Sequence, residues 1–308
     1  MSRAPHSHSL QSQLDPQLAS RLSSLRLVIA GHGRWGRVHS RRWEALLGRP
    51  PALIIDPVTP QGGHDSWRAS VSACEEAELM GAVAVVATPI DQLAAVASEL
   101  IERGVLGLLI EKPGGCSARA LEALERRAQE KGVKVAVGYI ERFNPALPPL
   151  LSALEAWLES PSARRAPLSV ERSARRPSVA GAGERLDLWC HDLNIMISAI
   201  HRHARRRPGE RGAHGCVEDL RVTEQGELIF EGERVGLLRV PEAAAERAWM
   251  IGDQRYSLQA EPTLDAAELD PLSLECLAFA RWVTLGVWSS SLCALDEAIE
   301  TLRALTAD

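Results

Sequence analysis

A glycine-rich turn between a short apolar run and a helical pattern constrains the fold more than any other feature. Residues 25–30 form an apolar run with β-branched side chains, and Gly31-His-Gly-Arg-Trp-Gly36 follows directly. Apolar residues then recur at helical spacing up to Gly48. When glycines lie between a strand and a helix in this way, they let the backbone approach a pyrophosphate. The start of the helix offers partial positive charge to the same phosphates. The sequence therefore predicts a dinucleotide-binding βαβ unit.

The pattern that follows predicts a doubly wound parallel sheet of the Rossmann type. Further apolar runs occupy residues 51–56, 82–87, 105–110 and 133–138. Helical patterns such as residues 92–103 and 118–131 lie between them. Alternating strands and helices require cover on both faces of a sheet. We assign residues 25–145 to this domain and residues 1–24, rich in Ser, Gln, His and Pro, to a flexible tail.

From about residue 144 the pattern changes to that of a second domain. Helices are expected at 147–158, 186–200, 272–285 and 296–305, and a strand near 168–172. Short strands without intervening helices are expected at 216–223, 227–231, 234–240, 247–251 and 255–259. Residues 146–308 are therefore predicted to form a C-terminal α/β domain with an open, mostly antiparallel sheet arranged as a meander.

Charge and composition exclude several classes of partner. The net charge of −5 gives no basic footprint for nucleic acid. The sequence contains no run of about 18 apolar residues, which a membrane-spanning helix would need. The start of the chain has no signal-peptide pattern, so we expect a cytoplasmic protein. The six cysteines are scattered without zinc-type spacing, so we expect reduced thiols and no metal site.

Asp56 bears on the choice of cofactor. It ends the second predicted strand, 20 residues beyond Gly36. A carboxylate in this place accepts hydrogen bonds from an adenosine ribose and repels a 2′-phosphate, which favours NAD over NADP. Arg34 or the loop after Pro57 could still accommodate a phosphate, so NADP stays possible.

Two groups of residues have the chemistry of proton transfer. Lys112 is one of three lysines among 35 basic residues and follows an apolar run, at the sheet edge where open α/β folds bind ligands. Asp187, His191 and Asn194 have the spacing of one helix face. Asp187 can orient His191, which can take and return a proton near neutral pH. The alternative is an acid near a helix start and a buried histidine with a structural partner.

Together these residues resemble the Gfo/Idh/MocA oxidoreductases. The resemblance covers about residues 25–305 and rests on Gly31–Gly36 with Trp35 and His39, Thr88-Pro89, Glu111-Lys112-Pro113, Gly138-Tyr-Ile-Glu-Arg-Phe-Asn-Pro145, Asp187-Leu-Trp-Cys-His191, and Pro271–Glu275 followed by Phe279. It implies that Lys112 and His191 are catalytic and flank the nicotinamide, with Asp187 supporting His191. It also implies a homodimer or homotetramer acting on a small molecule.

The candidate binding residues fall into two sets. Those expected at the cofactor are Gly31, His32, Gly33, Arg34, Trp35, Gly36, Asp56, Thr88, Pro89, Glu111 and Lys112. Those expected at the substrate are Tyr139, Arg142, Asn144, Arg172 and Asn194. The segment from Arg142 to Pro145 is similar to that of family members acting on nucleotide sugars. Asn194 and Leu93 depart from the family pattern, where many members have an acid and a histidine, and leave the substrate open.

The expected function is an NAD(P)-dependent oxidoreductase that moves hydride at a secondary alcohol or ketone of a sugar or nucleotide-sugar-like substrate. Two alternatives remain. One is a reductase of a C=N or C=C bond in a biosynthetic pathway. The other is a non-catalytic NAD(P)-binding sensor, which would have no need of the proton-transfer groups Lys112, His191 and Asp187.

Overall fold

The computed structural model describes residues 15–58, 65–159, 166–171, 182–206, 217, 219–223, 225–239, 247–258 and 270–306, with the backbone alone at 182–188, 239 and 247. The chain divides into two compact units. Unit 1 comprises Met1–Gly115, Ala120–Gly138 and Thr263–Leu295, and unit 2 comprises Cys116–Arg119, Tyr139–Pro262 and Asp296–Asp308.

Unit 1 contains the predicted parallel sheet. Its strands are β1 (Leu27–Ala30), β2 (Leu53–Ile55), β3 (Trp67–Arg68), β4 (Val83–Val86), β5 (Gly107–Glu111) and β6 (Lys134–Gly138). They lie in the order β3-β2-β1-β4-β5-β6, and every neighbouring pair is parallel. The Rossmann prediction is confirmed. The strand order reverses between β1 and β4, where folds of this kind bind ligands outside the carboxyl ends of the strands.

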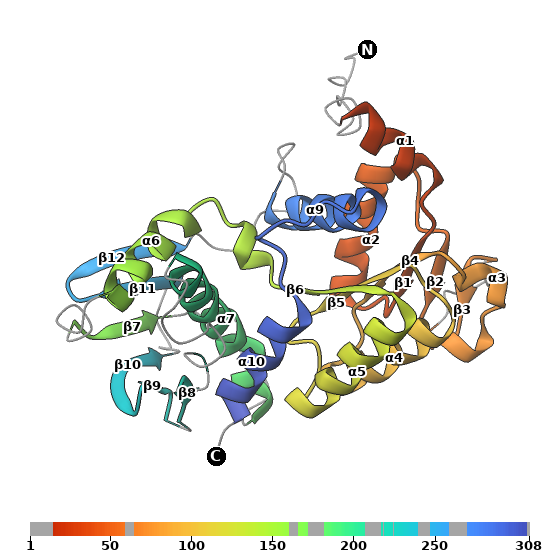
Figure 1. Cartoon of the computed structure of the whole chain (residues 1–308). Helices are drawn as coiled ribbons and strands as arrows, with labels where there is room; N and C mark the ends of the chain where they lie inside the picture. Colours follow the sequence, from red (N-terminus) through yellow and green to blue (C-terminus); the bar gives the residue numbers. More distant parts are fainter. Residues whose placement is uncertain are drawn as a thin grey trace, which may run out of the picture. The chain divides into compact units, whose positions relative to one another are not determined.

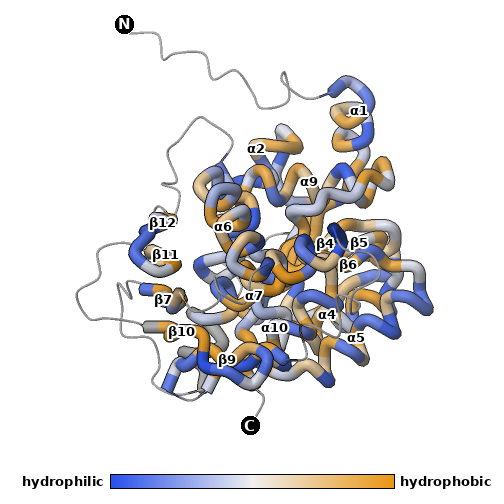
Figure 2. The backbone as a smooth tube through the Cα atoms, turned by 60° about the vertical axis from the view of Figure 1, so that its left-hand side comes forward, coloured by the Kyte–Doolittle hydropathy of each residue, from blue (hydrophilic) through white to orange (hydrophobic). Residues whose placement is uncertain are grey.

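Helices cover both faces of this sheet. The helices are α2 (Arg34–Leu47), the short α3 (Glu76–Leu79), α4 (Ile90–Glu102) and α5 (Ala118–Lys131), and a 3₁₀ turn, η2, spans Val71–Ala73. In Figure 1, α2 lies on one side of the strands and α4 and α5 on the other. All side chains of β1 and β4 are buried, as two-sided cover requires. Figure 2 shows the hydrophobic residues gathered at β4 to β6 and hydrophilic ones on the outer turns of α5.

The N-terminal tail predicted over residues 1–24 is wrong for its last part. Residues Pro16–Ser24 form helix α1, which packs against α2 and α9. The Asp15 side chain accepts hydrogen bonds from the backbone N–H groups of Gln17 and Leu18, at 2.9 and 3.2 Å, and Pro16 occupies the first helical position. Leu18 and Leu22, one turn apart, are buried. Residues 1–14 lie outside the described part of the chain.

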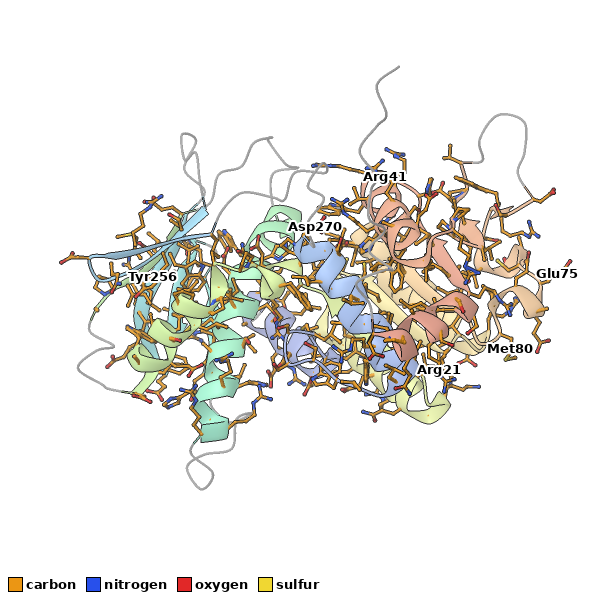
Figure 3. The ribbon with its side chains drawn as sticks, turned by 90° about the horizontal axis from the view of Figure 1, so that it is seen from above. Arg21, Arg41, Glu75, Met80, Tyr256 and Asp270 are labelled. Carbon is orange, nitrogen blue, oxygen red and sulfur yellow. The ribbon has the colours of Figure 1, made fainter. Side chains whose placement is uncertain are left out.

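Helix α9 (Pro271–Leu285) belongs to unit 1, although it comes from the range predicted for the second domain. Asp270 caps its start by accepting from the Ser273 N–H at 2.8 Å, and Figure 3 shows Asp270 at this end of the helix. The same carboxylate forms an ion pair with Arg42 of α2 at 2.6 Å. Farther along, the Cys293 carbonyl accepts a hydrogen bond from the Val137 N–H at 2.9 Å. Helix α9 packs against α1, α2 and the edge strand β6 of unit 1.

Unit 2 holds a second, mixed sheet. Its strands are β7 (Leu168–Glu171), β8 (Arg221–Val222), β9 (Glu227–Phe230), β10 (Glu233–Arg239), β11 (Arg247–Ile251) and β12 (Gln254–Leu258). Their order is β12-β11-β7-β10-β9-β8, with β7 and β10 parallel and the other pairs antiparallel. The mostly antiparallel prediction is confirmed. The simple meander is wrong because β7, which comes earlier in the chain, lies between β10 and β11.

Within its described residues, unit 2 also contains three helices and one turn. They are the 3₁₀ turn η3 (Ile140–Phe143), α6 (Leu147–Glu159), α7 (Ala182–Arg206) and α10 (Leu295–Thr306). Helix α6 packs against β11 and β12 of the sheet. Every residue from Cys190 to Ile200 is buried, so this stretch of α7 runs through the core of the unit. Among the described residues, no helix has both the length and the apolar character that a membrane crossing demands.

Candidate dinucleotide site and acid–base residues

The glycine turn is shaped by two close backbone contacts. Gly31 follows β1 with φ of 87°, and a Cβ there would lie 2.6 Å from the carbonyl atoms of Ala87. A Cβ on Gly36 would lie 1.9 Å from the Gly31 oxygen. Only glycine fits either place. Around a Cβ on Gly33, by contrast, there is open space within 4 Å. Gly33 is the residue before the start of α2, so the first N–H groups of this helix have room for an anion beside them.

Asp56 is fixed next to this turn. One carboxylate oxygen accepts from the His32 N–H at 2.6 Å and the other from the Val58 N–H at 2.8 Å. The indole of Trp67 donates to the Asp56 backbone carbonyl at 2.9 Å and packs edge-on against the His32 ring, 5.2 Å between centroids. Each carboxylate oxygen keeps a further lone pair for a ligand hydroxyl. Trp67 was not predicted, because β3 has two residues and no readable periodicity.

The ring of His32 is held in its neutral form near neutral pH. Burial lowers its pKa below the usual 6.5, and the guanidinium of Arg37 lowers it further, while the Asp56 carboxylate opposes both. The Arg37 side chain also donates to the His32 carbonyl at 3.1 Å. Arg34, the first residue of α2, is exposed and lies 5.9 Å from the Trp35 ring centroid. Two arginines therefore stand beside the glycine turn.

Thr88 provides a second sign that unit 1 is built for a ligand. It follows β4 at the carboxyl edge of the sheet, and Pro89 then precedes α4. The Thr88 hydroxyl is buried and has no hydrogen-bond partner within the described part of the chain. A buried hydroxyl without a partner is costly unless a ligand satisfies it. The space at Gly33, the carboxylate of Asp56 and this hydroxyl fit a bound dinucleotide.

Lys112 lies in a tight turn after β5. The Lys112–Pro113 peptide is cis, and the Gly114 N–H donates to the Glu111 carbonyl at 3.0 Å. The Glu111 carboxylate, predicted at the cofactor, is bonded to Nε2 of His39 at 2.7 Å. Sequence reasoning did not foresee this pair, since 72 positions separate its members. Lys112 thus lies at the expected edge of the sheet, directly after β5, and its catalytic role stays a prediction.

The other two lysines have structural partners. The ammonium group of Lys131 lies 3.3 Å from the Glu102 carboxylate on the surface. Lys134 donates to the carbonyls of Trp282 and Val283, at 2.8 and 3.1 Å, in the last turn of α9. A cation in this position also interacts favourably with the negative end of the helix dipole.

In unit 2, His191 lies within the buried stretch of α7. It is 6% exposed, and its ring meets that of Tyr139 edge-on, with the centroids 5.8 Å apart. Asp187 lies four residues earlier in the same helix, but its side chain is outside the described part, as is the whole of Arg172. The support of His191 by Asp187 therefore stays a prediction.

Arg142 and Asn194, both predicted at the substrate, contact each other inside unit 2. The Arg142 Nε donates to the Asn194 side-chain oxygen at 2.7 Å, and the Asn194 amide donates to the Thr301 hydroxyl at 3.0 Å. Arg142 also pairs with Glu297 of α10 at 2.5 Å. Arg142 is 7% exposed and Asn194 is 1% exposed. These contacts tie η3, α7 and α10 together, which is a structural role that the sequence pattern did not indicate.

Asn144 also has local partners. Its side-chain oxygen accepts from the Ala146 N–H at 2.9 Å, and its amide donates to the Glu141 carboxylate at 3.0 Å. The first of these contacts stabilises the turn that leads into α6. Tyr139, with 1% exposure, is buried before η3. Their predicted contact with substrate is not tested by these bonds.

His201 and two acids of α10 form a buried charge cluster. Nε2 of His201 lies 2.8 Å from Glu300 and Nδ1 lies 3.5 Å from Glu297. Burial opposes the charged ring, but the hydrogen bonds and charges of Glu297 and Glu300 outweigh it and raise the pKa of His201 to about 9. Burial likewise opposes the Glu297 carboxylate, but Arg142 and His201 lower its pKa to about 2. At neutral pH, both His201 and Glu297 are therefore charged.

The described residues contain no group of three or more His, Cys, Asp or Glu side chains placed to hold a metal ion.

The site residues divide between the units. Unit 1 holds the glycine turn, Asp56, Thr88 and Lys112, while unit 2 holds His191 with Tyr139.

Comparison with known proteins agrees with this geometry. Residues 25–139 match the model of an oxidoreductase family with an NAD-binding Rossmann fold, the Gfo/Idh/MocA family. The rhizopine catabolism protein MocA of Rhizobium meliloti is 27% identical over 143 residues, which cover 44% of each protein. The chain therefore matches less than half the length of this curated relative.

Solved structures resemble nearly the whole chain. UDP-N-acetylglucosamine 3-dehydrogenase GnnA from Acidithiobacillus ferrooxidans aligns with a TM-score of 0.61 at 20% identity, over 91% of this chain and 95% of that one. GenD2 from gentamicin A biosynthesis, solved in complex with NAD, aligns with a TM-score of 0.67 at 17% identity, over 92% of each chain. A putative myo-inositol dehydrogenase from Sinorhizobium meliloti gives 0.60 at 14% identity, over 92% and 96%.

These structural likenesses extend the shared fold over both units. The match to the family model lies on the glycine turn, Asp56, Thr88 and Lys112. Residues 25–139 are thus similar to the NAD-binding Rossmann fold of the Gfo/Idh/MocA oxidoreductase family.

Proposed function

We propose that the protein is an NAD-dependent oxidoreductase that transfers hydride between nicotinamide and a secondary alcohol or ketone of a sugar or nucleotide-sugar-like molecule. The observation that carries the proposal is the open start of α2 at Gly33 beside the fixed carboxylate of Asp56. The names of two structural neighbours, a UDP-N-acetylglucosamine 3-dehydrogenase and a putative myo-inositol dehydrogenase, support a polyhydroxy substrate.

In this proposal, the groups of the chain hold the substrate oxygen and move one proton. NAD, when bound, supplies the acceptor of the hydride that leaves the carbinol carbon. The Lys112 ammonium donates a hydrogen bond to the substrate oxygen, which stabilises the charge that develops there. The imidazole of His191 takes the hydroxyl proton during oxidation and returns it during reduction.

The cofactor preference follows from Asp56. Backbone N–H groups of His32 and Val58 fix its two oxygens, so the carboxylate is held in place when a 2′-phosphate approaches. We therefore propose that NAD is preferred to NADP, despite the nearby Arg34 and Arg37. Titration with NADH and NADPH, followed by energy transfer from the tryptophans, measures the preference. Asp56→Ser should narrow the difference in Kd between the two cofactors, and tighter NADPH binding by the wild type would contradict the assignment.

Lys112→Met tests the reaction itself. We expect full NADH binding and a loss of turnover on the order of 100-fold, because the substrate oxygen loses its charged donor. Lys131→Met, which changes an exposed lysine of α5, is the matched control and should keep normal turnover. The substrate panel begins with nucleotide sugars and polyols and includes C=N and C=C compounds.

The outcomes separate the competing functions. Normal turnover by Lys112→Met would refute the assigned chemistry. Turnover of C=N or C=C compounds alone would favour the biosynthetic reductase. NADH binding without hydride exchange to any compound would favour the non-catalytic sensor.

The assembly and compartment belong to the same proposal. We infer a homodimer or homotetramer in the cytoplasm, supported by the family resemblance and by cysteines without a pairing pattern. Light scattering of the purified protein measures the mass of the assembly, and a monomer at working concentration would contradict this inference.

A further inference from the structure

A histidine of α2 is hydrogen-bonded to the residue next to Lys112. His39 belongs to α2, less than one turn beyond Gly36, and Glu111 is the last residue of β5. Nε2 of His39 and Oε1 of Glu111 are 2.7 Å apart, and the two side chains are 1% and 13% exposed. Both ends of the contact are therefore shielded from water, where a hydrogen bond to a carboxylate is strong.

The direction of this bond is set by its chemistry. A carboxylate accepts, so the Nε2–H of His39 donates to Glu111. The other ring nitrogen, Nδ1, is buried and has no hydrogen-bond partner among the residues that the structure describes. Within the described part of the chain, the hydrogen bond to Glu111 is therefore the polar contact that orients the His39 ring. Loss of the ring would leave the nearly buried Glu111 carboxylate without this donor.

The surroundings of Glu111 make this donor more important. Glu275 of α9 is 2% exposed, and its Oε2 lies 3.4 Å from the place of a Cβ on Gly138, the strand partner of Glu111. Burial raises the pKa of the Cys276 thiol, and the carboxylates of Glu275, Asp270 and Glu111 raise it further, against the charge of Arg42. Glu111 therefore lies in an acidic neighbourhood, in which a hydrogen-bond donor offsets the repulsion between neighbouring carboxylates.

Glu111 is also the first residue of the turn that holds Lys112. Its carbonyl accepts from the Gly114 N–H at 3.0 Å and closes the turn around Lys112 and Pro113. A rotation of Glu111 would move the peptide that it shares with Lys112. We propose that His39 is a positioning residue for Lys112, acting through its hydrogen bond to Glu111. The proposal rests on the proposed function of Lys112 and gives Glu111 a role other than direct contact with the cofactor.

One helix then sets two parts of the site. The start of α2 is fixed against the glycine turn by Gly36, and its next turn fixes Glu111 through His39. Displacement of a catalytic group by about 1 Å can cost on the order of 100-fold in rate. A small tilt of α2 would therefore displace both the glycine turn, where a pyrophosphate is expected, and Lys112.

Two amide replacements of His39 form the principal test. His39→Gln can place an N–H near the position of Nε2, whereas the shorter His39→Asn reaches only as far as Nδ1. We expect kcat to fall on the order of 30-fold in His39→Asn and less than about fivefold in His39→Gln, with Kd for NADH within about twofold of the wild type in both. Ser40→Ala is the matched control, a buried neighbour on α2 whose hydroxyl has no partner in the described part, and should leave kcat unchanged.

A double-mutant cycle tests whether His39 acts through Lys112. In a Lys112→Met background, His39→Asn should lower the residual rate by less than about threefold, since the group that it positions is gone. Two full and independent losses would overturn the proposal. Equal effects of the Asn and Gln replacements would overturn it as well, because they would mean that the donor at Nε2 is not what matters.

A readout without turnover separates this proposal from the proposed function. The chain has three lysines, so protein labelled with ¹³C at lysine Cε should give three NMR signals, assigned with single Lys→Arg variants. His39→Asn should shift the signal of Lys112 and spare those of Lys131 and Lys134, while His39→Gln should leave all three near their wild-type positions. An unmoved Lys112 signal would overturn the positioning role, whether or not a substrate has been found.

Discussion

Replacing His201 with glutamine should remove the contribution of this residue to the pH dependence of the stability of unit 2 between pH 6 and pH 9.5. His201 is buried on α7 between Glu297 and Glu300 of α10, at 3.5 and 2.8 Å. Its pKa is raised from 6.5 to about 9. A group with a raised pKa stabilises the fold fully below its unfolded pKa, and this contribution is lost as the pH rises through the folded value.

The size of the effect follows from these two pKa values. Proton linkage gives a stabilisation of about 3 kcal/mol at pH 6, about 2 kcal/mol at pH 7.5 and close to zero at pH 9.5. Glu297 acts in the opposite direction: its pKa is lowered to about 2, so its contribution is present above pH 4.5 and is lost as the pH falls toward 2. We therefore expect this cluster to stabilise unit 2 most between about pH 4.5 and 6.5.

Urea unfolding followed by circular dichroism at pH 6, 7.5 and 9.5 measures the effect. The wild type should lose about 3 kcal/mol over this range from His201, and His201→Gln should lose almost none from this source. The comparison uses the slope with pH, because the substitution also removes a partner of two carboxylates. His203→Gln, two residues along the same helix, is the control and should keep the wild-type slope. An unchanged slope in His201→Gln would refute the reasoning.

Three further predictions concern unit 1. Gly36→Ala should abolish NADH binding, since its Cβ would meet the Gly31 oxygen at 1.9 Å; retained binding in a cofactor titration would contradict this. Thr88→Val should keep or slightly raise thermal stability and weaken NADH binding by about fivefold, because the lost hydroxyl is buried without a partner in the described part. Lys134→Met should destabilise by about 1–2 kcal/mol in urea, since it removes two bonds to the last carbonyls of α9, whereas Lys131→Met should cost less than about 0.5 kcal/mol.

The strands of unit 1 were predictable because burial on both faces leaves short unbroken apolar runs. The runs at 82–87 and 105–110 correspond to β4 and β5 within two residues at each end. Helix α1 was missed although Asp15-Pro16 and the pair Leu18 and Leu22 have the pattern of a capped helix. Its polar surroundings resembled a tail, and its stability depends on packing against α2 and α9.

The site was predictable to the extent that its chemistry depends on backbone shape. A residue with the close backbone contacts of Gly31 or Gly36 must be glycine, so the sequence motif indicated these two positions. Asn194 shows the limit: its place on the face of α7 was readable, but its partners Arg142 and Thr301 come from distant segments. The bond between His39 and Glu111 was hidden for the same reason, since no local pattern encodes a contact across 72 positions.

The return of α9 to unit 1 has a consequence for synthesis on the ribosome. The chain leaves unit 1 after Gly138 and comes back at Thr263–Leu295. At about 5–20 residues per second, roughly 160 further residues take on the order of ten to thirty seconds to make. During that interval the strands of unit 1 have been synthesised, but α9, which packs against α1 and α2, has not. A nascent chain stalled near residue 139 would thus contain the whole family-matched segment and still expose apolar surface to chaperones.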